Sequence, residues 1–115
     1  MYNFSDSNCA KRLVVEGTTV WGIDLAGAYE AFEMHHGKPA YFNKDKQVWL
    51  YSTKYGDWLF DTMKYADQQI AGALPSGSHF DCPNNHPYQS SNLKGEYELN
   101  PCIIVSCKHH RWLYF

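Results

Sequence analysis

The sequence predicts a mainly β protein, a small antiparallel sheet or barrel in a single domain of residues 1–115. Two observations lead to this prediction. Short runs of β-branched and aromatic residues recur every ~8–12 residues, and turn-forming residues separate them. Aromatic residues also make up 17% of the chain, which supplies the bulk to fill a small core. A chain of 115 residues has room for one modest core, so large multidomain enzyme folds are excluded.

Four strands are predicted in the first half of the chain, which is the more strongly patterned half. The run QVWLYS is the clearest, because it combines β-branched and aromatic residues between two polar turns. The other runs are shorter and end at glycine, proline or polar residues. The predicted strands are residues 13–15, 40–42, 47–52 and 58–60.

Two segments also fit helices on local rules. Residues 24–37 begin with Asp24, a good N-cap, and end at Gly37, a good C-cap, with Ala, Leu, Glu and Met between them. Residues 61–74 place Met63, Ala66 and Ile70 at near-helical spacing after Asp61, so a short helix is predicted there as an option. Residues 75–115 are rich in turn-forming residues and are expected to form a loop-rich C-terminal third.

The spacing of glycine and aromatic residues provides a further clue. The pattern is Val15-x-Gly17, Leu25-x-Gly27-x-Tyr29, Gly37-x-Pro39-x-Tyr41, Trp49-Leu50-Tyr51 and Asp57-Trp58. It resembles a small, aromatic-rich β-module that is repeated in modular eukaryotic proteins, and the resemblance covers residues 13–62. This chain departs from the module's pattern at His36, where asparagine is usual, and at Leu59-Phe60. The resemblance implies a fold and no activity. It places Tyr29 on a strand, so we expect residues 28–34 to be extended despite their helical propensity.

The aromatic residues also suggest a function. Tyr41, Trp49 and Trp58 are expected in the core, because their spacing belongs to the structural pattern. Tyr51, Tyr55 and Trp21 are the candidate ligand-binding residues, because flat rings with polar tips stack on sugars or on a partner's side chains. The sequence therefore predicts a non-catalytic binding module for a carbohydrate or a protein partner.

Four cysteines leave three states open: disulfides, free thiols or a metal site. Disulfides are typical of small exported domains, so they favour an extracellular or secreted protein. Residues 1–15 lack the apolar stretch of a secretory signal, and a cytoplasmic location stays open. Because the C-terminal third has few apolar residues, we expect a bridge from Cys9 to one of Cys82, Cys102 and Cys107, with the other two paired.

The alternative is an intracellular interaction module stabilised by zinc. Its candidate ligands are imidazole and thiolate groups in the C-terminal third, at Cys82, His86, Cys102 and Cys107. The chain has no C-x2-C pair, so this ligand set is not a standard zinc motif. No other cofactor is expected.

Composition and motifs exclude several partners and activities. The net charge of −2 lacks the basic excess of a nucleic-acid-binding protein. The apolar runs are far shorter than the ~20 residues of a membrane span. The thiol–imidazole pair at Cys107 and His109 lacks an orienting third group. Carboxylate pairs such as Glu30 and Glu33 need a cleft that a single small sheet rarely provides. A small hydrolase is the least favoured reading, and we expect no catalytic residues.

Overall fold

The computed structural model describes residues 8–19, 22–68, 71–73 and 81–107, and every helix or strand element within these ranges is a β-strand. The strands are β1 (Arg12–Glu16), β2 (Gly27–His35), β3 (Lys38–Asn43), β4 (Val48–Ser52), β5 (Trp58–Asp61), β6 (Ala71–Ala73), β7 (Gln89–Ser91), β8 (Tyr97–Leu99) and β9 (Ile104–Cys107). They form one antiparallel sheet in the order β8-β7-β6-β5-β4-β3-β2-β1-β9. The predicted fold class is confirmed.

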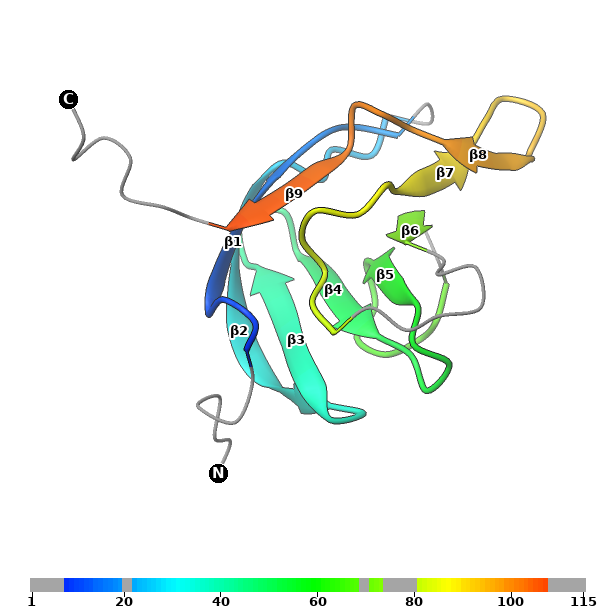
Figure 1. The fold of residues 1–115 in the computed structure, drawn as a ribbon. Helices are drawn as coiled ribbons and strands as arrows, with labels where there is room; N and C mark the ends of the chain where they lie inside the picture. Colours follow the sequence, from blue (N-terminus) through cyan, green and yellow to red (C-terminus); the bar gives the residue numbers. More distant parts are fainter. Residues whose placement is uncertain (1–7, 20–21, 69–70, 74–80, 108–115) are drawn as a thin grey trace, which may run out of the picture.

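The sheet curls into a half-barrel (Figure 1). Its last strand, β9, returns to pair with β1, so that Leu13 lies opposite Cys107. The backbone N–H of Asn85 donates to the carbonyl of Val105, and that of Asn100 donates to the carbonyl of Tyr88. Residues 81–107 therefore share one sheet and its hydrogen bonds with the first half of the chain.

The main core lies on the inner face of the curl. Successive strand residues point to opposite faces, so alternate apolar residues of β1 to β5 meet there. Tyr41 and Trp58 are fully buried in this core, as predicted. The core residues are Leu13, Val15, Leu25, Tyr29, Tyr41, Val48, Leu50, Trp58, Phe60, Ala71, Tyr88, Ile103 and Val105.

A second, smaller cluster lies on the outer face of the sheet. Ala40, Tyr51 and Leu59 are buried there, and Trp49 and Tyr65 pack against them. The prediction that Trp49 belongs to the core is therefore only partly right, because its ring is half-buried in this outer cluster. Both faces of β4 are covered, which is unusual for a strand of a small antiparallel sheet.

Residues 27–35 form strand β2, which confirms the extended structure expected for residues 28–34 against local propensity. Tyr29 is fully buried, donates its hydroxyl to the carbonyl of Leu25 and contacts the edge of the Phe60 ring. His36 and Gly37 both have positive φ, 52° and 77°, as a tight two-residue hairpin turn requires. Burial of the Tyr29 ring outweighs the small difference in intrinsic propensity.

The helix considered for residues 61–74 is wrong for the described part of this segment, residues 61–68 and 71–73. Residues 71–73 form β6, and residues 62–65 are turns. Asp61 does not cap a helix; its carboxylate accepts from the N–H groups of Met63 and Gln68 and so holds the loop after β5. The positive φ of Tyr65 and Asp67 then folds the chain back over the outer face, where a helix could not continue.

One disulfide, Cys9–Cys82, joins residues 73 positions apart. The expected bridge from Cys9 is therefore confirmed. The expected second bridge is wrong, because Cys102 and Cys107 are free thiols. Strand β9 keeps the chain extended between them at about 3.3 Å per residue, beyond the ~7 Å Cα separation that a disulfide allows.

In the described ranges, no helix is long and apolar enough to cross a membrane.

Candidate functional site

The three residues predicted to bind a ligand have different surroundings. Tyr55 is 68% exposed. Tyr51 is fully buried, so its ring does not face solvent. Its hydroxyl lies 2.8 Å from the Asp61 carboxylate and 3.0 Å from that of Asp67, under the loop of residues 62–68, and donates its one proton to either of them. Burial, followed by the Asp61 carboxylate, raises the pKa of Tyr51 and keeps it a hydrogen-bond donor. Trp21 lies outside the described residues.

Aromatic side chains gather instead on the outer face of β2, β3 and β4. We call this group the aromatic face; its members are Phe32, His35, Phe42, Trp49 and Tyr65. Ring centroids of Phe42 and Trp49 lie 4.2 Å apart, and Phe32 meets the edge of Trp49 at 5.3 Å. The His35 and Tyr65 rings stack in parallel at 3.7 Å. Phe32 is 51% exposed, so the aromatic face presents this ring to solvent.

A β-bulge in β2 creates this arrangement. The pairing of β2 with β3 shifts between Ala31 and Glu33, so Phe32 is an extra residue in its strand. Phe32 contacts Trp49, and Glu33 contacts Tyr65, so these two consecutive side chains both reach the outer face. In a regular strand they would point to opposite faces. Bulges are frequent beside functional sites because they re-aim a side chain in this way.

Lys64 lies over the aromatic face. Its ammonium nitrogen is 5.1 Å from the Phe32 centroid, 5.4 Å from Trp49 and 5.2 Å from Tyr65. It also forms an ion pair of 3.0 Å with Glu33, whose carboxylate accepts a short hydrogen bond from the Tyr65 hydroxyl. The Glu33 side chain is only 14% exposed. A mostly buried carboxylate and three rings thus surround one cation.

A groove of about 490 Å³ runs beside the aromatic face. Phe32 and Phe42 belong to both, so the groove has an aromatic side. Four charged residues also line it, namely Arg12, Glu30, Lys44 and Asp45. The groove therefore combines apolar ring surface with hydrogen-bond donors and acceptors of both charges.

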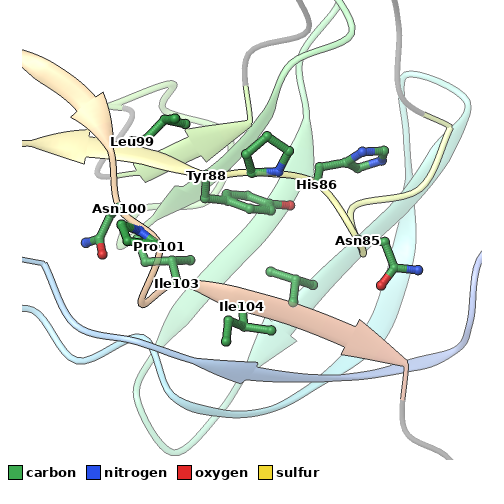
Figure 2. Close-up of a pocket in the computed structure, with 10 residues that line it drawn as sticks. Asn85, His86, Tyr88, Leu99, Asn100, Pro101, Ile103 and Ile104 are labelled. Atoms are coloured by element: carbon green, nitrogen blue, oxygen red, sulfur yellow. The ribbon is translucent and has the colours of Figure 1, made fainter.

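A second cavity, of about 280 Å³, lies at the seam where β9 approaches residues 85–88 (Figure 2). Tyr88, Leu99 and Ile103 make its lining mainly apolar. Two of the polar groups near it are already engaged: the Tyr88 hydroxyl donates to the Pro83 carbonyl, and His86 Nε2 lies 2.9 Å from the Cys82 carbonyl. Among the residues that the structure describes, no carboxylate or amine lines this cavity, so it offers less chemistry than the groove.

The zinc alternative does not fit this geometry. The Cys82 sulfur is bonded to Cys9, which removes it as a thiolate ligand. Among the described residues, no three His, Cys, Asp or Glu side chains come close enough to hold a metal ion. The ligand set Cys82, His86, Cys102 and Cys107 is therefore not formed.

His35 should make stability depend on pH. Burial and the charges of His36 and Lys64 lower the pKa of His35 from its usual 6.5, although Asp67 and Glu33 oppose the shift. Below pH ~6.5, His35 therefore binds a proton more readily in the unfolded chain than in the folded protein. The free energy of unfolding falls as the pH drops below about 6.5 and levels off below the pKa of His35 in the folded protein. We expect His35→Phe to lose less stability than the wild type between pH 7.5 and 5 in thermal melts. Parallel curves for the two proteins would contradict this.

The sequence-based prediction missed Phe32, Phe42, Lys64 and Tyr65. Alternation along β3 gave a signal for one of these positions, since Phe42 follows Tyr41 of the inner core and pairs with Trp49 on β4. Nothing local in the sequence marks the bulge at Phe32 or the return of Lys64 and Tyr65 to the outer face.

Comparisons of the chain with protein-family models, with curated proteins and with solved structures find no match. The function of the aromatic face and the groove is therefore argued from their geometry.

Proposed function

We propose that this protein is a non-catalytic binding module that recognises a carbohydrate in the groove beside the aromatic face. The observation that carries the proposal is the pairing of two rings, Phe32 and Phe42, with charged groups along the same groove. A sugar ring has an apolar C–H face, which packs on an aromatic ring, and hydroxyl groups at its edge. Carboxylate and guanidinium groups such as Glu30 and Arg12 form strong hydrogen bonds with such hydroxyls.

Two further features support this proposal. The groove lies on paired strands, which hold the rings and the charged groups in fixed positions and so reduce the entropy cost of binding. The disulfide Cys9–Cys82 is compatible with an extracellular location, where free and cell-surface glycans are met. We therefore propose an extracellular protein as the setting for this function.

Replacing Phe32 by alanine is expected to weaken sugar binding about tenfold, because it removes the most exposed ring of the groove. A glycan array with the wild-type protein identifies the ligand, and calorimetry on the variants measures its affinity. Tyr55→Ala is the matched control, since it removes another exposed ring that does not line the groove.

Two results would contradict this site. If Phe32→Ala binds the sugar as tightly as the wild type, the groove is not the binding site. If only Tyr55→Ala loses affinity, the sugar binds at Tyr55 instead. If no glycan binds at all, the carbohydrate proposal is wrong and a protein partner takes its place.

A further inference from the structure

The aromatic rings of Phe32, Trp49 and Tyr65 surround the ammonium group of Lys64. Phe32 and Trp49 stand nearly perpendicular, at 86°, and Trp49 and Tyr65 are inclined at 52°. The ammonium group of Lys64 lies within 5.1–5.4 Å of all three ring centroids. Ring faces carry partial negative charge, so several rings around one point stabilise a cation there. We call these rings, together with Glu33, the cation cage.

Glu33 strengthens the cage because it is held in place. Its carboxylate is mostly buried and accepts the Tyr65 hydroxyl, which fixes it beside the ring that forms one wall. A positioned carboxylate in a partly desolvated site attracts a cation more strongly than one in free solution. The bulge in β2 brings Phe32 and Glu33 to the same face, so the cage depends on this irregularity of the strand.

Lys64 is a poorly matched occupant of the cage. Its ammonium group is compact and strongly hydrated, and its side chain remains 41% exposed. It lies in the turns between β5 and β6, outside the sheet. By contrast, a quaternary ammonium group is weakly hydrated, cannot donate hydrogen bonds and is the cation that aromatic cages recognise best.

We infer that the cation cage of Phe32, Trp49, Tyr65 and Glu33 is a binding site for a quaternary ammonium group, and that Lys64 occupies it as an internal competitor. The incoming cation displaces the Lys64 ammonium group into solvent and takes its place between the rings and the carboxylate. This inference does not depend on sugar binding, because the cage and the groove share only Phe32.

The test uses variants of Lys64 and small quaternary cations. Choline and free trimethyllysine are titrated into ¹⁵N-labelled protein, and binding is followed at the indole resonance of Trp49, assigned with Trp49→Phe. Lys64→Ala is expected to bind choline roughly tenfold more tightly than the wild type, since it removes a tethered competitor. Sodium chloride at equal concentration controls for ionic strength.

Matched variants separate the cage from general charge effects. Lys54 is the control, because its ammonium lies 5.2 Å from the centroid of Tyr55, a ring that does not belong to the cage. Lys54→Ala changes net charge as Lys64→Ala does and should leave choline affinity unchanged. Adding Glu33→Gln to Lys64→Ala keeps an acceptor for the Tyr65 hydroxyl and should reverse most of the gain.

Two outcomes would overturn the inference. One is a Lys64→Ala variant, with wild-type dispersion of its amide spectrum, that binds choline no more tightly than the wild type. The other is an equal gain in Lys54→Ala. A Lys64→Met variant, which keeps the apolar stem without the charge, replaces Lys64→Ala if the latter unfolds. Comparing the affinities for choline and for trimethyllysine shows which of the two quaternary ammonium compounds fits the cage better.

Discussion

Replacing Trp58 by alanine is expected to lower the free energy of unfolding by about 3–5 kcal/mol. Trp58 is the largest fully buried side chain of the described residues, and it lies on β5, which has a neighbouring strand on each side. Its ring lies 6.4 Å from that of Tyr41 in the main core. The substitution would leave a cavity lined by rigid strands, which cannot move in to fill it. Urea unfolding followed by far-ultraviolet circular dichroism measures the loss.

Trp49→Ala is the matched control for this prediction. It removes the same side chain from the neighbouring strand, but from the half-buried outer cluster. We expect a smaller loss than for Trp58→Ala, because the vacated space opens to solvent. A cost for Trp58→Ala below about 1 kcal/mol would contradict the packed inner core. If both variants lose the same free energy of unfolding, the outer cluster contributes as much to stability as the main core.

Much of the fold could be predicted because it rests on local patterns. The β-branched and aromatic residues of QVWLYS and the turn residues between runs mark β4 and its neighbours directly. β2 could be predicted only against its composition, through the resemblance to the repeated β-module, which places Tyr29 on a strand. At the start of β2, a Cβ atom on Gly27 would lie 2.7 Å from the Asn43 side chain of β3, so a larger residue would not fit there. That contact depends on the paired strand and is not visible in the segment itself.

The candidate site could not be predicted for a related reason. Alternation assigns Tyr51 and Trp49 to the same outer face, but it does not tell which of them is covered. The loop of residues 62–68 decides this, because its Asp67 and Tyr65 close over Tyr51 and leave Trp49 half-exposed. Such a contact between distant segments depends on tertiary packing. The same applies to Lys64, whose ring partners lie as many as 32 positions away.

Removing the disulfide with Cys9→Ser and Cys82→Ser is expected to cost about 4 kcal/mol. The bridge closes a loop of 73 positions, and the chain-entropy model assigns roughly this value to a loop of that length. The bridge joins the chain just before β1 to the start of residues 82–88, which have few strand contacts of their own. We therefore expect residues 81–107 to loosen before the sheet of β2 to β5.

Hydrogen exchange with and without reductant measures this order of loss. The amide of Asn85, bonded to the Val105 carbonyl, should lose protection early, whereas the amides of β3 and β4 should keep theirs. Cys102→Ser with Cys107→Ser is the matched control, because it removes the same number of sulfurs and no bridge. Its stability should stay near that of the wild type, and it should still respond to reductant. Equal protection of residues 81–107 in both conditions would show that packing of β9 on β1, without the bridge, holds the C-terminal third in the sheet.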